Sequence, residues 1–103
     1  MSPKKQYLVY ALDHTDAEAP QRRQAARAAH LAQASTAKKE QRLVSAGAML
    51  SSDTEPNAKM IGSVLVFQAE SEAQVREWIQ SDPYIAGNVW GQISVHLFFP
   101  ANL

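Results

Sequence analysis

The sequence contains no cysteine, and its 103 residues carry no net charge, because ten lysine and arginine residues balance ten aspartate and glutamate residues. The lack of cysteine excludes a disulfide framework, a thiolate metal site and a cysteine nucleophile. The balanced charge provides no general attraction to nucleic acid or to an anionic membrane surface. We therefore expect neither nucleic acid nor a membrane among the partners of this protein.

Long hydrophobic runs are also absent. No apolar stretch approaches the roughly 20 residues of a membrane-spanning helix. The apolar segment Tyr7–Leu12 is too short for the core of a signal peptide. The basic, alanine-rich segment 21–39 has the composition of a mitochondrial targeting segment, but acidic residues precede it, which argues against that interpretation. These absences favour a cytoplasmic location.

A chain of this length suits one domain, and its 46% hydrophobic residues are enough for a real core. We expect a single domain over residues 1–103. Hydrophobic alternation predicts four strands, and helix propensity predicts two helices. The expected strands are 6–12, 43–50, 62–69 and 89–99, and the expected helices are about 20–42 and 72–80, with a surface loop at 51–61 and one extra turn at 84–88.

The ends of the two helices carry recognisable signals. Pro20 suits a first helical turn, and neither glycine nor a further proline interrupts the chain up to Arg42. Ser71 is a typical N-cap with Gln74 three residues later, which fits a capping box. Pro83 ends the second helix, because the residue before a proline avoids the helical conformation. The order β-α-β-β-α-β predicts a ferredoxin-like α+β fold, with a four-stranded antiparallel sheet that carries both helices on one face.

The face of the sheet opposite the helices also needs a cover. The first, third and last strands are expected to be apolar in both rows of side chains, so large apolar groups should remain on that face. In a chain this short, a second copy of the same sheet is the natural cover. We therefore expect a homodimer through the sheet faces. His96 should share a row with Trp90, Gln92, Ser94 and Phe98, in the interface or in a cavity.

One face of the long predicted helix gathers groups that suit chemistry. Arg23, Arg27 and His30 follow one another at spacings of four and three residues, which places them on the same side of the helix. Two like charges four residues apart cost roughly a few tenths of a kcal/mol. That repulsion suggests an anionic partner, and neighbouring alanines leave room beside the imidazole. The ordinary alternative is a packed histidine beside a solvated basic face.

A second candidate motif, Ser81-Asp82-Pro83-Tyr84, follows the second predicted helix. An aspartate before proline at this place is also ordinary turn chemistry. Tyr84 is amphipathic and suits either the core or the lining of a pocket. If the fold joins the two motifs, His30 and Asp82 would form a base and the acid that orients it.

No motif for a metal or a cofactor is present in the sequence. His14, His30 and His96 are too far apart for a metal-binding spacing. The four glycines are scattered rather than gathered into a phosphate-binding loop, and no nucleophile elbow occurs. We therefore expect no bound metal and no cofactor.

The motifs have a characteristic order along the chain. The strand Tyr7-Leu8-Val9-Tyr10-Ala11 precedes Asp13, and Arg23-x-x-x-Arg27-x-x-His30-Leu31 is followed by Gly47, by Gly62-Ser63 and by Ser81-Asp82-Pro83-Tyr84. In this order and spacing, the chain resembles the YciI-like (YCII-related) family of the dimeric α+β barrel superfamily. The resemblance implies a ferredoxin-like fold, a dimer, and a pocket with a histidine–aspartate pair. By position this pair would be His30 and Asp82, with Arg27 and Arg23 beside it.

The resemblance also implies classes of chemistry. Members similar to this chain include an enzyme that removes chloride from a chlorinated hydroxyquinol, and the related muconolactone isomerases suggest proton transfer on ring-derived acids. We therefore expect a small-molecule enzyme of the lyase, isomerase or hydrolase type. His30 would move a proton while Asp82 fixes its ring. Arg23, Arg27 and Tyr84 would bind a small anionic or aromatic-derived substrate.

Two other interpretations remain open. The same dimer could be a non-catalytic module that binds a small ligand or serves as an accessory subunit, with the arginines as anion clamps. Alternatively, the polar pair only fixes the long helix on the sheet. The segment 51–60 departs from the family pattern, so the substrate of a relative does not transfer directly to this chain.

Overall fold

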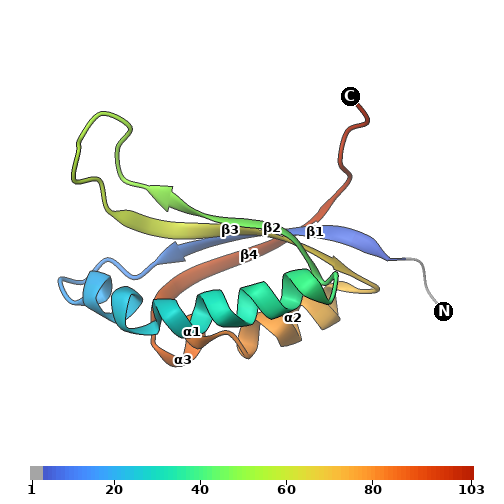
Figure 1. Ribbon diagram of the computed structural model, residues 1–103, viewed down its shortest axis with the longest axis horizontal. Coiled ribbons are helices and arrows are strands. Elements are labelled where there is room, and N and C mark those ends of the chain that lie inside the picture. The colour runs from blue at the N-terminus through green and yellow to red at the C-terminus, as the bar shows by residue number, and fades with distance from the viewer. Residues whose placement is uncertain (1–3) are drawn as a thin grey trace.

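The computed structural model describes residues 4–103 and has the predicted order of strands and helices (Figure 1). The extra turn after the second helix is a short helix of its own. The elements are β1 (Lys5–Asp13), α1 (Ala19–Lys39), β2 (Leu43–Leu50), β3 (Met60–Ala69), α2 (Glu72–Gln80), α3 (Pro83–Ala86) and β4 (Trp90–Phe98). None of the helices in this part of the chain is both long and apolar enough to cross a membrane.

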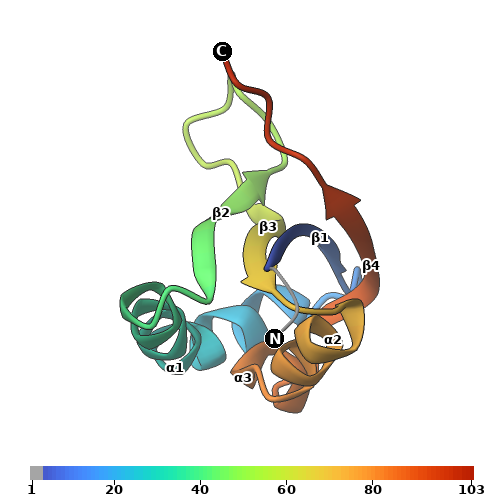
Figure 2. The ribbon, with the colours of Figure 1, turned by 90° about the vertical axis from the view of Figure 1, so that its right-hand side faces the viewer.

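The four strands form one antiparallel sheet in the order β2-β3-β1-β4. The helices lie on one face of it, with α1 beneath the β2 side, α2 beneath the β4 side and the short α3 between them (Figure 2). This two-layer arrangement confirms the predicted ferredoxin-like α+β fold. It also brings α1 into contact with α3, two segments that are far apart in the sequence.

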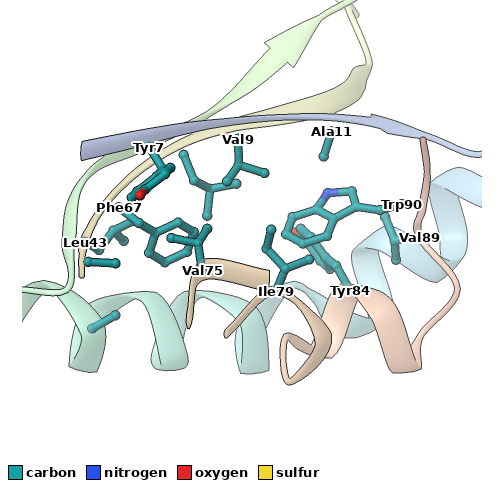
Figure 3. Packing of buried hydrophobic residues seen from close by; sticks show 13 residues of the cluster. Tyr7, Val9, Ala11, Leu43, Phe67, Val75, Ile79, Tyr84, Val89 and Trp90 are labelled. Atoms are coloured by element: carbon teal, nitrogen blue, oxygen red, sulfur yellow. The ribbon is translucent and has the colours of Figure 1, made fainter. Parts of the chain in front are cut away.

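The core lies between the sheet and the helices (Figure 3). Side chains alternate along β1, so Tyr7, Val9 and Ala11 point towards the helices, where Val75 and Ile79 of α2 meet them. Val9 and Val75 have no exposed surface, and the full burial of such a side chain contributes about 1.5–3 kcal/mol. This packing fixes α2 and therefore the start of α3, which follows after a short turn.

A β-bulge in β4 changes one predicted row of side chains. Leu12 pairs with Gln92 and Asp13 pairs with Trp90, which leaves Gly91 as the extra residue. Trp90 therefore turns towards the helices, where it is 5% exposed, and the expectation that it shares a row with Gln92 is wrong. Strict alternation predicts rows only in strands without bulges. A lone glycine is the one sequence sign of this bulge.

The outer face of the sheet is only partly apolar. Its β4 row contains Gln92, Ser94 and His96, so the expectation that the last strand is apolar in both rows is wrong. Tyr10 and Phe98 keep 41% and 37% of their surfaces exposed on this face. The homodimer through the sheet faces stays a prediction.

Helix α1 ends at Lys39 rather than at the expected Arg42. Gln41 adopts a left-handed conformation with a φ of 62°, and the Arg42 N–H donates to the Ala37 carbonyl at 2.9 Å. This hydrogen-bond pattern closes the helix and reverses the chain into β2. Because glycine usually occupies the left-handed position, a glutamine there carries no signal of a helix end.

Replacing Gln41 by glycine should stabilise the fold. A Cβ atom in the left-handed conformation costs about 1–2 kcal/mol, which glycine avoids, although glycine also makes the unfolded chain more flexible. We expect a net gain of about 0.5–1 kcal/mol, measured as a higher urea midpoint and melting temperature. Gln24→Gly, the same change in the right-handed, exposed middle of α1, is the control and should lower both. A loss of stability in both variants would contradict the strain at Gln41.

Candidate active site

His30 and Asp82 meet between α1 and α3. The Nδ1 atom of His30 lies 2.8 Å and 3.0 Å from the two carboxylate oxygens of Asp82. The two side chains are only 9% and 10% exposed, so solvent screens their interaction poorly. A carboxylate at Nδ1 accepts a hydrogen bond from the N–H of that nitrogen, which leaves Nε2 as the basic nitrogen of the neutral ring.

The Asp82 carboxylate also begins α3. Its Oδ1 accepts a hydrogen bond from the backbone N–H of Tyr84 at 2.9 Å, and Pro83 occupies the first helical turn. This is the ordinary N-cap that an Asp-Pro sequence predicts. The same carboxylate therefore makes both the predicted turn and the predicted contact with His30. The backbone of α3 fixes the position of the group that holds the imidazole.

Two aromatic rings enclose the His30 imidazole. Tyr84 stacks on it with ring centroids 3.9 Å apart and planes within 9°, and Trp90 meets it edge-on at 5.8 Å. Burial raises the pKa of the Tyr84 hydroxyl above its ordinary value of 10.0, against the weaker opposing effect of Arg23 and Arg27. Tyr84 is therefore neutral over the whole range in which histidines titrate. It lies in the core and also lines the pocket described below, the two positions that its sequence allows.

Arg23 is buried and engaged at both Nη atoms. Nη1 donates to both carboxylate oxygens of Asp13, at 2.8 Å and 2.9 Å. Nη2 donates to the Gly62 carbonyl at 3.2 Å and to the Ser63 hydroxyl at 3.0 Å, which also accepts the Trp90 indole N–H at 3.2 Å. The Arg23 and Asp13 side chains are each 7% exposed. A buried ion pair needs such additional hydrogen bonds to offset its desolvation.

Arg27 differs from Arg23 in its charged neighbours among the described residues. It lies three residues before His30 on the same helix face and is half-buried. Within residues 4–103, no carboxylate forms an ion pair with it. Of the two arginines expected to bind an anion, Arg27 is the one whose charge no carboxylate in the described part of the chain neutralises. Substrate binding by either arginine stays a prediction.

His30, Arg27 and Tyr84 line a cavity of about 210 Å³ between α1 and the β2–β3 side of the sheet. Arg23 and Ser63 also line it, and its apolar lining includes Leu31, Ala34, Ala46, Ala48, Met60 and Leu65. A cavity of roughly 150 Å³ already holds benzene, so this space suits one substituted ring. Hollows of about 330 Å³ and 520 Å³ lie at the β1–α1 turn, away from this histidine.

The arrangement suits proton transfer. In the described part of the chain, His30 Nε2 forms no hydrogen bond, and the ring lines the cavity. A histidine whose other nitrogen is held by a carboxylate is a recurring form of general base. Arg27 is placed to pair with an anion formed nearby. Among residues 4–103, no three His, Cys, Asp or Glu side chains gather as a metal site would require.

Sequence reasoning from the residues alone misses three members of this cluster: Asp13, Ser63 and Trp90. Ser63 is the single hydroxyl in the apolar run 63–67, and Asp13 ends the first strand, so each carries only a faint signal. Trp90 has the pattern of an ordinary core residue. Asp13 and Ser63 meet Arg23, and Trp90 joins them through Ser63. These contacts depend on how closely α1 approaches β1 and β3, which local sequence does not reveal.

Known proteins share the fold and the sequence pattern over nearly the whole chain. The family model of the YCII-related domain matches residues 6–98, and the chain belongs to this family. It is 35% identical over 94 residues to Protein YciI of Escherichia coli and of Shigella flexneri, covering 89% of this chain and 94% of each relative. A solved structure, the 5-chloro-2-hydroxyhydroquinone dehydrochlorinase of Burkholderia phenoliruptrix in complex with 2,5-dihydroxybenzoquinone, superposes with a TM-score of 0.81 at 26% identity, over 93% of this chain and 95% of that one.

Asp13→Asn should destabilise the protein strongly, because it leaves the Arg23 guanidinium buried without a counter-charge. We expect the free energy of unfolding, measured in urea, to fall by about 3–5 kcal/mol, the usual cost of breaking a buried pair. Arg22 and Asp16 form a similarly short but more exposed pair, in which Arg22 lowers the pKa of Asp16 to about 2. Asp16→Asn is the matched control and should have a far smaller effect. Equal losses in the two variants would show that burial of the first pair has no special weight.

Proposed function

We propose that this member of the YCII-related family is an enzyme that performs general acid–base chemistry on a small hydroxylated aromatic compound. One observation carries the proposal: the Asp82 carboxylate is hydrogen-bonded to Nδ1 of His30, while the imidazole lines a cavity that Arg27 also lines. A histidine whose ring is oriented by a carboxylate, beside an arginine and in a cavity that can hold one aromatic ring, favours proton transfer over simple packing.

His30 is the base in this proposal. The neutral imidazole takes a proton at Nε2 from a substrate hydroxyl, while Asp82 accepts the hydrogen bond from Nδ1 and stabilises the imidazolium that forms. The stack with Tyr84 and the edge contact with Trp90 keep the imidazole in one plane. The ring therefore needs little reorganisation when the proton moves.

Arg27 binds the negative charge that develops on the substrate. A ring hydroxyl that loses its proton becomes an oxyanion, and a guanidinium forms strong charge-assisted hydrogen bonds with such an oxygen. Arg27 lies on the same face of α1 as His30 and lines the same cavity. The base and the anion-binding group can therefore contact neighbouring oxygens of one molecule.

The size and lining of the cavity support a single aromatic ring as the substrate. The apolar lining residues can contact the faces of a ring, while Arg27 and His30 can bind its hydroxyl groups. The solved relative is a dehydrochlorinase of 5-chloro-2-hydroxyhydroquinone and holds 2,5-dihydroxybenzoquinone, both planar rings with acidic hydroxyls. A chlorinated hydroquinone becomes a quinone when one hydroxyl proton and the chloride leave and the second hydroxyl proton moves to the carbon that carried the chlorine, so this reaction needs no external oxidant.

His30→Gln should remove most of the activity without unfolding the protein. The test supplies chlorinated and unchlorinated hydroxyhydroquinones and follows chloride release and the absorbance of the ring. We expect turnover of at least one compound by the unmodified protein, and a fall in kcat/KM of about 10²–10⁴-fold in the variant, the usual contribution of a general base. Gln24→Ala, on the exposed side of the same helix, is the control and should keep full activity.

Two outcomes would contradict this function. Turnover that survives His30→Gln would exclude His30 as the base. Binding of the compounds, seen as a rise in melting temperature without product from any of them, would favour the non-catalytic ligand-binding module instead.

Asp82→Asn should separate the two roles of this side chain. The amide oxygen of asparagine can still accept the Tyr84 N–H and cap α3, but its NH₂ group would then donate to His30 Nδ1. The ring proton moves to Nε2, so kcat should fall by about 10³–10⁴-fold, while the melting temperature changes little. Asp82→Ala also removes the cap and should cost about a further 1 kcal/mol of stability. An asparagine variant with full activity would rule out Asp82 as the orienting group.

A further inference from the structure

We propose that Arg23 is a positioning residue: together with Asp13, it holds the Tyr84 ring flat against the His30 imidazole. The proposal rests on the acid–base role proposed for His30. It assigns Arg23 a task other than the substrate contact expected from the sequence.

Tyr84 lies between two side chains of α1. Its ring stacks on His30 with centroids 3.9 Å apart, and the Cζ atom of Arg23 lies 4.8 Å from the same ring centroid. Because the imidazole covers one face of the ring at stacking distance, the guanidinium lies over the other face. Residues 23 and 30 are about two helical turns apart, roughly 10.5 Å along the axis, which leaves room for one ring. Arg23, Tyr84 and His30 therefore form a continuous stack.

The sheet holds the Arg23 end of this stack. Asp13, the last residue of β1, binds Nη1 through both carboxylate oxygens. The Gly62 carbonyl and the Ser63 hydroxyl of β3 bind Nη2. The guanidinium plane is thus fixed by two neighbouring strands, which do not depend on the position of α3.

A second line of contacts leads from the same serine to the imidazole. The Ser63 hydroxyl accepts the indole N–H of Trp90, and Trp90 meets Tyr84 and His30 edge-on, at 5.4 Å and 5.8 Å. The Arg23 pair therefore supports the imidazole through both of its aromatic neighbours. A change at Arg23 should therefore alter the position of the His30 ring, even though no hydrogen bond joins these two side chains.

The bonding of Arg23 favours this role over substrate binding. Asp13 neutralises its charge, and both Nη atoms already donate to the protein. Among the buried side-chain nitrogens and oxygens of residues 4–103, only Arg23 Nε lacks a hydrogen-bond partner. This atom is bonded to the Cζ that lies 4.8 Å from the Tyr84 ring centroid, so the guanidinium contacts the ring on the side where it forms no hydrogen bond of its own.

The first test replaces the ion pair without leaving a buried charge. Asp13→Leu combined with Arg23→Met keeps a similar volume, a change that other buried pairs have tolerated. We expect kcat to fall about 10- to 100-fold, the effect of a small misplacement of a catalytic group, while KM changes by less than about twofold. The stacked Tyr84 ring shifts the NMR signals of the His30 ring protons away from those of a free histidine. In the double variant these signals should broaden, and their chemical shifts should move towards the free-histidine values.

Arg23→Lys is the second variant and does not depend on the double replacement folding. Lysine keeps the charge beside Asp13 but lacks the flat guanidinium that stacks on Tyr84. It should show the same loss of kcat and the same change in the His30 signals. Full kcat in this variant would mean that charge alone is needed, and would overturn the stacking proposal.

The neighbouring ion pair of α1 supplies the control. Asp16→Leu combined with Arg22→Met makes the same replacements in a pair that forms no hydrogen bond with Tyr84, although Arg22 also donates to the Asn88 carbonyl, and it should leave kcat and the His30 signals unchanged. Unchanged kcat and unchanged signals in the Asp13 and Arg23 double variant would overturn the proposal and leave that pair with a purely structural role. A raised KM with unchanged kcat would overturn it in favour of substrate contact.

Failure of the proposed function has a different signature. If His30 is not the base, His30→Gln keeps its turnover, or no compound of the panel is turned over. The His30 signals still report in that case whether Arg23 holds the stack, because they are measured on the protein without substrate.

Discussion

The carboxylate of Asp82 is the group on which the site depends, because it bonds two segments that are far apart in the sequence. One of its oxygens caps α3 through the Tyr84 N–H, and both lie within hydrogen-bond distance of His30 on α1. The cap sets where the carboxylate lies, and the carboxylate then sets which imidazole nitrogen carries the proton of the neutral ring. Tyr84, which the cap orders, stacks on the same imidazole. The geometry of the proposed base therefore follows from how one short helix begins.

A small core can contain this polar cluster because most of its charges have partners. Arg23 is neutralised by Asp13 and bonded to β3, and Asp82 is bonded to both a backbone N–H and an imidazole. These ion-pair and hydrogen-bond partners offset the free energy lost when the charged groups leave water. Arg27 is the exception within the described residues, and it lines the cavity. The oriented His30 imidazole, the positive charge of Arg27 and the apolar residues of the cavity together favour a small, flat, acidic molecule as the ligand.

Much of the fold follows from local sequence signals. The alternation in β1, the capping signals at Ser71 and the Asp-Pro turn predicted β1, α2 and the start of α3 closely. Two places could not be predicted, for local reasons. Gln41 ends α1 in a conformation that glycine usually marks, and the bulge at Gly91 turns Trp90 to the other face of the sheet. In both cases tertiary packing overrides a weak local preference.

The sequence by itself determined which groups share a face: helical spacing places Arg23, Arg27 and His30 on one side of α1, and the Asp-Pro pair places a carboxylate at a helix start. These are short-range consequences of backbone geometry, so they can be predicted from spacing alone. Only the tertiary structure decided that the carboxylate reaches the imidazole, that Asp13 pairs with one of the two arginines, and that Tyr84 contacts both Arg23 and His30. Those contacts join residues from separate elements, and their distances depend on how closely α1 packs against α3 and the sheet.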